Sequence, residues 1–253
     1  MQLIFIRFDD VFEKTPELEK LCSFFTKKGI PICLGVVPGS VTEECRIYLK
    51  GLCKKFPKLI EIDQHGVRHI RNNKGEFDIS DEKLVKELKW GKKKMSELFS
   101  KDFSEVLTVP WHTHNHSLFF LSKKLGYHAI SVNKRNDVNA KIFYAVGNFF
   151  RKHELLGHHV HSDTQRKNEI PEICPAIDFQ ENYNDAGKFK SIAKLKQEFI
   201  NQHSSQDKYC GFLIHPQYVK GPKRFAIIDK IISSVAEYPD IIFVKMGTVL
   251  KEN

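Results

Sequence analysis

The sequence predicts an α/β fold, and we expect a barrel of parallel strands that forms a single domain over residues 1–253. Short apolar runs alternate with segments of helical periodicity along the chain, which is typical of a parallel sheet buried on both faces. Polar residues suited to chemistry directly follow four of the apolar runs, and in an α/β barrel such residues gather at the carboxyl ends of strands. With 41% hydrophobic residues, the chain can bury one sizeable core.

The first sixty or so residues predict three strands and two helices. The chain begins with an apolar run, Leu3 to Ile6, which we assign to a strand. A helix follows, with Thr15 as its N-cap, Pro16 in its first turn and Gly29 beyond its end. The same reasoning predicts a strand at 30–37, a helix at 41–56 and a strand at 59–62.

The rest of the chain continues this alternation. Ser80 begins a long amphipathic helix that reaches about Phe99, and Gly126 ends a shorter helix at 116–125. Residues 133–187 contain Asn, Asp, Gly and His in irregular order, and we expect a long crossover rich in loops there. Further strands are predicted at 106–109, 128–132, 209–214 and 241–244, and further helices at 188–203 and 223–237.

The formal net charge of +9 includes lysine runs such as residues 92–94, which we interpret as solvated faces of helices. Nucleic-acid binding would require a basic patch interleaved with aromatic residues, or a known binding module, and the sequence shows neither. We therefore expect no nucleic-acid partner. A mildly basic surface would instead attract an anionic substrate, such as a nucleotide-linked sugar or a lipid head group.

The sequence predicts no integral membrane segment, because no run approaches the ~18 apolar residues that a membrane helix requires. It also indicates no signal peptide. Six cysteines are scattered without a Cys-x-x-Cys pair, which favours reduced, buried thiols over a disulfide framework or a zinc knuckle. A reducing cytoplasm is the expected location. The oligomeric state cannot be predicted from these patterns.

Two adjacent carboxylates, Asp9 and Asp10, end the first strand. Such a pair at the end of a buried strand is electrostatically costly unless a cation lies beside it. His65 and His69 are four residues apart, and we expect them on one face of a helix, where two imidazoles can share an ion. With Asp10 as a third ligand, positions for water and substrate stay open, as in catalytic metal sites. The sequence therefore predicts a site for a divalent ion, with zinc as the expected metal.

His215 ends another apolar run, and Pro216 after it cannot extend a strand. We expect this histidine to point into the pocket and to protonate a departing amine, while Asp9 takes the proton of an attacking water. Each motif alone also permits an ordinary role: a helix N-cap, a pair of surface histidines flanking a turn, or a core histidine. Their shared placement at strand ends favours one common site.

These motifs resemble those of the polysaccharide deacetylases, the NodB-homology family of metal-dependent N- and O-deacetylases, over nearly the whole chain. The segment Phe8-Asp9-Asp10 is similar to the first family motif, Thr-Phe-Asp-Asp, with Arg7 in the threonine place. The run from His65 to His69 resembles the second motif, His-x-x-x-His. The third motif, Arg-x-Pro-aromatic, and the fifth, a strand ending in histidine, resemble Val109-Pro110-Trp111 and Leu213-Ile214-His215. Gly66 inside the second motif and Pro216 after the fifth resemble the pattern of an atypical branch of the family. Within that branch, the deacetylase-like proteins of lipopolysaccharide biosynthesis are the most similar.

The resemblance implies a distorted (β/α)7 barrel and a metal-dependent deacetylase. It implies that Asp9 is the catalytic base, that His215 is the general acid, and that the main-chain N–H of Trp111 helps to hold the oxyanion. The metal ligands that it implies are Asp10, His65 and His69. The residues that we expect to contact the substrate are Pro110, His112 and His161.

Two departures from the family's pattern leave alternatives open. The family's third motif begins with an arginine that pairs with the catalytic aspartate, and Thr108 stands in that place. Either Arg7 or Arg68 would then orient Asp9. The family's fourth motif, an aspartate that orients the acid histidine, has no clear match, and the two candidates are Asp137 and Asp163.

From these patterns we expect a hydrolase that removes an N-acyl group, such as acetyl, from an amino sugar. The sugar is expected to be nucleotide- or lipid-linked and to belong to surface-polysaccharide biosynthesis. One alternative keeps the fold and the metal but hydrolyses another amide, such as that of a small heterocycle. A second alternative is a carbohydrate-binding relative without catalysis, which the missing third-motif arginine favours.

Overall fold

The computed structural model describes residues 1–72, 75–114, 117–132, 170–181, 188–205 and 207–251. The chain divides into two compact units. The first consists of Met1–Gly35, Val41–Ile62 and Pro175–Asn253, and the second of Val36–Ser40 and Asp63–Cys174. Strand β3 (Ile60–His65) runs through both, with its first three residues in the first unit and its last three in the second.

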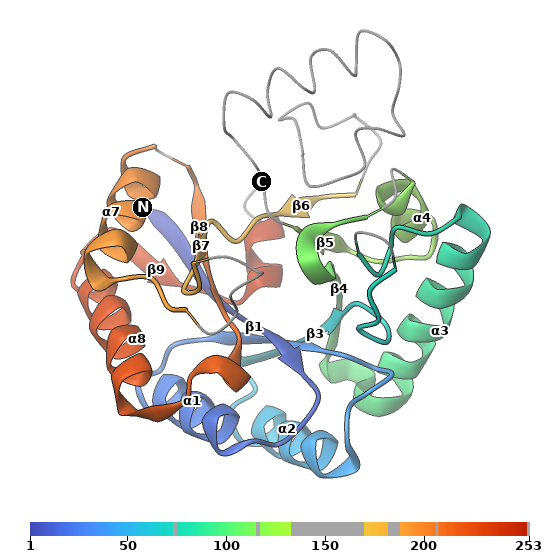
Figure 1. The fold of residues 1–253 in the computed structure, drawn as a ribbon, viewed down its shortest axis with the longest axis horizontal. Coiled ribbons are helices and arrows are strands. Elements are labelled where there is room, and N and C mark those ends of the chain that lie inside the picture. Colours follow the sequence, from blue (N-terminus) through green and yellow to red (C-terminus); the bar gives the residue numbers. More distant parts are fainter. Residues whose placement is uncertain (73–74, 115–116, 133–169, 182–187, 206, 252–253) are drawn as a thin grey trace, which may run out of the picture. The chain divides into compact units, whose positions relative to one another are not determined.

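The first unit is built around a ten-residue strand, β1 (Gln2–Val11), drawn in blue in Figure 1. Strand β8 (Tyr209–Ile214) runs parallel to β1, from Leu3 opposite Tyr209 to Phe8 opposite Ile214. Strand β7 (Ile177–Asp178) pairs with the other edge of β8, and β9 (Ile241–Phe243) pairs with the first residues of β1. On the other side of β1 come β2 (Ile32–Val36) and then the first half of β3.

The helices of the first unit connect these strands, and their caps follow from the sequence. Thr15 caps α1, because its hydroxyl accepts a hydrogen bond from the backbone N–H of Leu18 at 3.2 Å. Helix α1 packs on α8 through Phe24 and Phe225, whose ring centroids are 5.2 Å apart. The α-helices are α1 (Pro16–Lys27), α2 (Glu43–Lys55), α7 (Ile192–Ser204) and α8 (Gly221–Ala236); the 3-10 helices are η3 (Pro216–Tyr218) and η4 (Met246–Lys251).

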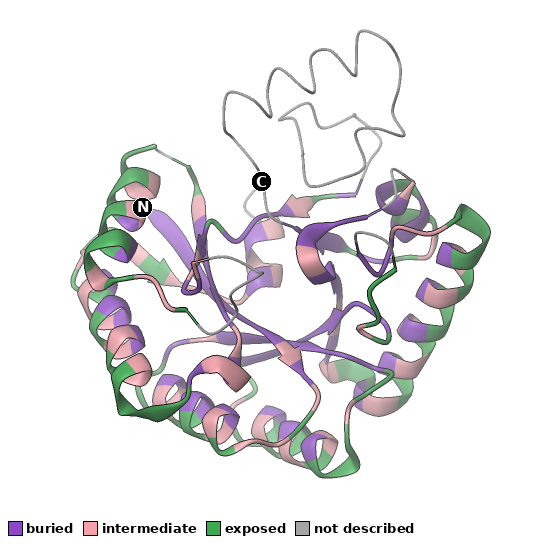
Figure 2. Ribbon diagram, viewed as in Figure 1, coloured by how far each residue is buried: buried purple, intermediate pink, exposed green. Residues whose placement is uncertain are grey.

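Strand β1 is deeply buried. Figure 2 shows it in purple along nearly its whole length, and nine of its ten residues are buried. Its inward positions are not all apolar, because Arg7 and Asp9 are 0% and 2% exposed. Buried charges of this kind persist when they are paired, so the end of β1 is chemically unlike an ordinary strand end.

The second unit contains parallel strands in the order β6-β5-β4-β3. Strand β4 (Phe103–Thr108) pairs with β5 (Ala129–Ser131), and β5 pairs with β6 (Glu172–Ile173). Its helical segments are α3 (Asp81–Phe99), η1 (Ser100–Asp102), η2 (Pro110–His112) and α4 (Leu118–Lys124).

Helix α3 covers the end of β3 through its apolar stripe, which includes Leu84, Leu88, Met95 and Phe99. Gly91 lies in this stripe because a Cβ there would come within 2.5 Å of the Gln64 side chain. The hydroxyl of Tyr127 donates to Oε1 of Gln64 at 2.8 Å. Gln64, the residue before His65, is thus held by both Gly91 and Tyr127.

The described residues agree with the predicted alternation and correct it in places. The β8 bounds are as predicted, and α1 and α2 differ from their predicted bounds by no more than two residues. Strand β3 extends to His65 beyond its predicted end at 62, and the helix predicted to start at 188 starts at Ile192. Two short strands, β6 and β7, lie in the stretch predicted to be a loop-rich crossover; residues 133–169 and 182–187 of that stretch are outside the described residues.

All six cysteines are buried and none forms a disulfide, as the sequence predicts. Burial raises the pKa of the Cys22 and Cys45 thiols to about 12. Among the described helices, none combines the length and the apolar character that crossing a membrane would require.

Candidate active site

The end of β1 holds a buried ion pair between Arg7 and Asp9. Nη2 of Arg7 donates to Oδ2 of Asp9 at 2.6 Å. Both residues lie on the same face of the strand because they are two positions apart. Of the two arginines that the sequence offers as partners for Asp9, the structure shows Arg7 in contact with it.

Arg68 has other partners in its own unit. Its Nε donates to Oε2 of Glu87 at 3.1 Å, and its guanidinium lies 4.4 Å from the ring of Trp90. Both Glu87 and Trp90 belong to α3. The Arg68 side chain is 44% exposed, so it sits on the surface of α3.

Asp10 adopts a left-handed backbone conformation with φ of 59°. Such a conformation is uncommon for a residue other than glycine, although aspartate tolerates it better than most. Nε2 of Gln217, in η3, donates to Oδ2 of Asp10 at 2.7 Å. The backbone turn and this amide together orient the Asp10 carboxylate. Gln217 was not singled out in the sequence, where its only signal is its place two residues after His215.

His215 directly follows β8, as predicted, and is partly exposed. Its Nδ1 is buried and has no hydrogen-bond partner among the described residues. The neighbouring strand β7 ends at Asp178, which pairs in register with Leu213. Burial raises the pKa of the Asp178 carboxyl above its ordinary value, while the charge of nearby His215 acts in the opposite direction.

Asp178 lies near His215 and was not singled out in the sequence. The two aspartates considered as partners of the acid histidine, Asp137 and Asp163, lie outside the described residues, as does His161. The sequence offers only a weak signal for Asp178. An apolar residue followed by a carboxylate occurs at Ile177 and Asp178, but the strand has only two residues.

His65 is the last residue of β3 and is 2% exposed. The hydroxyl of Thr108 donates to the carbonyl oxygen of Gln64 at 3.2 Å and lies 2.8 Å from Nδ1 of His65. Because its one proton is committed to Gln64, the hydroxyl accepts from His65, and the neutral ring carries its proton on Nδ1. Nε2 of His65 is therefore the nitrogen that can bind a cation.

The prediction that His65 and His69 share a helix face is wrong. His65 ends a strand and His69 lies in the turn that follows, with φ of 56°. The turn nevertheless brings the two rings together, with centroids 5.4 Å apart. The ring of His69 also stacks on Trp111 at a centroid distance of 4.4 Å. A strand end plus a tight turn thus replaces the expected helix spacing.

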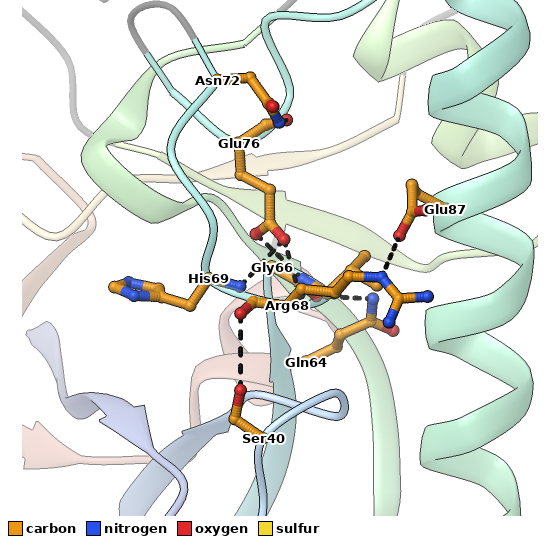
Figure 3. Close-up of polar contacts among 9 residues, drawn as sticks. Ser40, Gln64, Gly66, Arg68, His69, Asn72, Glu76 and Glu87 are labelled. Atoms are coloured by element: carbon orange, nitrogen blue, oxygen red, sulfur yellow. Dashed lines mark hydrogen bonds and ion pairs between the residues drawn. The ribbon is translucent and has the colours of Figure 1, made fainter.

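The carboxylate of Glu76 holds this turn, which Figure 3 shows. It accepts hydrogen bonds from three consecutive backbone N–H groups, those of Val67, Arg68 and His69, at 3.0, 2.6 and 3.0 Å. In Figure 3 the side chains of Arg68 and His69 point to opposite sides of the turn. Glu76 was not identified from the sequence, because no motif marks it.

The remaining predicted site residues lie in η2, directly after β4. Trp111 and His112 both have positive φ, at 51° and 53°. His112 is buried at 3% exposed, whereas Trp111 is partly exposed and stacks on His69. Pro110 lies against Gly66, where a Cβ would collide with its ring. Consecutive residues in a sparsely populated conformation are typical of functional segments.

No family model matches the chain. A search of curated proteins likewise finds no match.

Solved structures do resemble it over almost its full length. A protein assigned as a polysaccharide deacetylase from Mycobacterium smegmatis superposes with a TM-score of 0.70, at 12% identity, over 99% of this chain and 89% of that one. The PuuE allantoinase superposes with a TM-score of 0.67, at 9% identity, over 99% and 88%. A family 4 acetyl xylan esterase from Clostridium thermocellum, in complex with a cobalt ion, superposes with a TM-score of 0.60 at 12% identity. The match covers 99% of this chain and 91% of that one.

At these identities the likeness establishes the architecture. Strands followed by helices, running parallel within each unit, agree with a distorted (β/α) barrel, as the sequence predicts. The chain therefore has the fold that the polysaccharide deacetylases share with an allantoinase.

Proposed function

We propose that this protein is a metal-dependent hydrolase that removes an N-acetyl or other N-acyl group from an amino sugar. The proposed sugar is nucleotide- or lipid-linked and belongs to surface-polysaccharide biosynthesis in the cytoplasm. The two compact units would together form one catalytic domain. The observation that carries the proposal is the hydrogen-bonded pair of Thr108 and His65, which leaves Nε2 of His65 as a ligand atom beside His69.

The proposed metal ligands are Asp10, His65 and His69, with zinc as the first metal to test. Two imidazoles and one carboxylate are the donor set of many catalytic zinc sites. Asp10 is the last residue but one of β1 and His65 is the last residue of β3, and parallel strands present their carboxyl ends at the same edge. When bound, the ion would supply Lewis acidity, which polarises the acyl carbonyl and lowers the pKa of water.

Asp9 is the proposed catalytic base. The Arg7 guanidinium holds its carboxylate by a 2.6 Å contact, so the residue that takes the proton from water would keep a fixed position. A positioned base typically contributes about 10²–10⁴-fold to the rate. Asp9→Asn should therefore lose most hydrolysis and keep its metal.

His215 is the proposed general acid, with Asp178 as the residue that orients and charges it. A departing amine must gain a proton, which a histidine can deliver. The charge of His215 acts on the nearby Asp178 carboxyl, which supports the pairing of these two residues. The main-chain N–H of Trp111 is proposed to stabilise the oxyanion. The proposed substrate contacts are Pro110, His112 and His161.

Acetate release tests the proposal directly. Purified protein loaded with zinc is incubated with a panel of N-acetylated sugar nucleotides and N-acetylated glycolipids, beside Asp9→Asn as control. Release by the wild type that depends on added metal and is lost in Asp9→Asn supports the function. Zinc-loaded protein that releases no acetate from any member would contradict it.

The allantoinase likeness gives weight to a second candidate, hydrolysis of another amide. The same base, acid and ligands would serve, because the reaction differs only in the group around the scissile bond. A parallel panel of small heterocyclic amides separates the two candidates. A protein that binds metal and sugar yet hydrolyses neither panel would be the non-catalytic carbohydrate-binding relative.

A further inference from the structure

One buried carboxylate satisfies three successive backbone donors in the turn after β3 (Figure 3). Oε2 of Glu76 accepts from Val67, while its Oε1 accepts from both Arg68 and His69. The residue is only 6% exposed. Successive N–H groups that converge in this way form a concave binding place for an anion. Here the anion is a side chain of the protein itself, and both of its oxygens are used.

Glu76 is itself fixed by contacts that involve Asn72 and Gly75. Nδ2 of Asn72 donates to the carbonyl oxygen of Glu76 at 3.1 Å. Asn72 and Gly75 exchange two backbone hydrogen bonds, of 3.1 and 2.8 Å. Gly75 also packs so closely on Thr113 that a Cβ would come within 2.7 Å of it. The carboxylate therefore has a defined position from which to hold the turn.

The turn needs such support because its backbone is unusual at both ends. Gly66 has φ of 58°, and a Cβ at this position would overlap the Glu76 carboxylate. His69 has φ of 56° without being a glycine. Left-handed residues other than glycine persist when surrounding contacts impose the conformation. The hydrogen bond from His69 N to Glu76 is such a contact.

We propose that Glu76 is a positioning residue for the metal site: it holds the backbone of residues 67–69 so that the ring of His69 faces His65. This inference rests on the proposed function, because it concerns the ligand pair that the function requires. Glu76 is not among the proposed ligands, and both of its oxygens accept hydrogen bonds from backbone N–H groups. It acts only through the conformation of the turn.

The chain offers a matched control at Glu87. Glu87 belongs to α3, and its carboxylate also contacts the turn. It accepts from the side chain of Arg68 rather than from a backbone N–H group. Glu76→Gln and Glu87→Gln each remove one negative charge near the turn. Only Glu76→Gln replaces the acceptor of three backbone bonds with an amide, whose NH₂ group opposes a backbone donor.

The test measures the zinc dissociation constant by competition with a chromophoric chelator, together with the melting temperature of the metal-free protein. Glu76→Gln should stay folded and bind zinc about 10–100-fold more weakly, the usual effect of losing a group that orients a ligand. Glu76→Asp keeps the charge but is one methylene shorter, and it should also bind more weakly than the wild type. Glu87→Gln should match the wild type.

Wild-type affinity in Glu76→Gln would overturn the inference, and so would equal losses in Glu76→Gln and Glu87→Gln, which would indicate a charge effect. If Glu76→Gln does not fold, Glu76→Asp decides alone: weaker binding supports the positioning role and unchanged binding overturns it. A wild type that binds no zinc would instead remove the proposed metal site, and the inference with it.

Discussion

Thr108 stands where the third motif of the resembling family begins with an arginine, and its hydroxyl takes part in two hydrogen bonds. It joins the Gln64 carbonyl to Nδ1 of His65, and so selects which imidazole nitrogen is available. The positive charge that pairs with the carboxylate at Asp9 comes instead from Arg7, two residues earlier on β1. Two residues that look like departures from a motif are thus individually engaged in hydrogen bonds at the site.

Replacing Thr108 by valine keeps its shape and removes the hydroxyl. His65 then loses the acceptor that holds its proton on Nδ1, and zinc affinity should fall about 10–100-fold. Thr108→Ser, which keeps the hydroxyl, is the matched control and should bind as the wild type does. Isothermal titration of the metal-free proteins measures both. Equal affinities of the valine and serine variants would show that the hydroxyl does not set the ligand atom.

The raised pKa of Asp178 predicts how the stability of the protein depends on pH. Burial raises the pKa of its carboxyl in the folded protein, so the folded state binds this proton more tightly than the unfolded state does. Its contribution to stability is therefore most favourable below the unfolded pKa and is lost as the pH rises through the folded value. Asparagine does not ionise, so the Asp178→Asn variant should not lose this stability as the pH rises.

The free energy of unfolding, measured by urea titration at several pH values, should shift in favour of Asp178→Asn as the pH rises above about 4, the ordinary aspartate range. Hydrolysis of an amide substrate should fall in the same variant, since His215, the proposed acid, loses its carboxylate neighbour. A stability difference that is constant with pH would contradict the raised pKa.

At the level of strands, the contact between β1 and β8 depends on Gly211. The residue pairs in register with Phe5, and a Cβ there would overlap the Phe5 ring, which is fully buried. Gly211→Ala should therefore destabilise the protein by about 1–3 kcal/mol, the usual cost of overpacking a core. Gly51→Ala in α2 is the control, because a Cβ added at Gly51 has no atom within 4 Å.

Gly51→Ala should instead stabilise helix α2, by about 0.5–1 kcal/mol, since alanine is the better helix former. Denaturant unfolding of the two variants checks both signs. A Gly211→Ala variant as stable as the wild type would show that the β1–β8 packing is looser than the structure describes.

Elements with a strong local signal could be predicted from the sequence. Helix α1 has its cap at Thr15 and its first-turn proline, and β8 is a continuous apolar run closed by a proline after His215. Strand β7 could not be predicted, because two residues give no periodicity, and Asp178 was missed with it. The end of β3 was missed because its last three residues are polar although buried, and burial there comes from tertiary packing.

For the site, the spacing of His65 and His69 pointed to a shared ion but gave the wrong local structure. A four-residue separation fits a helix face and equally a strand end followed by a tight turn. Glu76 accepts hydrogen bonds from backbone N–H groups of this turn, and such contacts leave no pattern in the sequence. The proposed ligands could therefore be singled out from the sequence, whereas a residue that contacts only their backbone could not.

For the protein as a unit, the proposal depends on one ion being shared by residues from separate parts of the chain. Zinc titrated into chelator-treated protein, with the bound fraction determined by elemental analysis, measures this directly. The wild type should bind about one equivalent of zinc tightly, as expected for a three-ligand site. Asp10→Asn, His65→Ala and His69→Ala should each lose tight binding, while Asp9→Asn should retain it. Full zinc binding in His65→Ala would contradict the proposed ligand set.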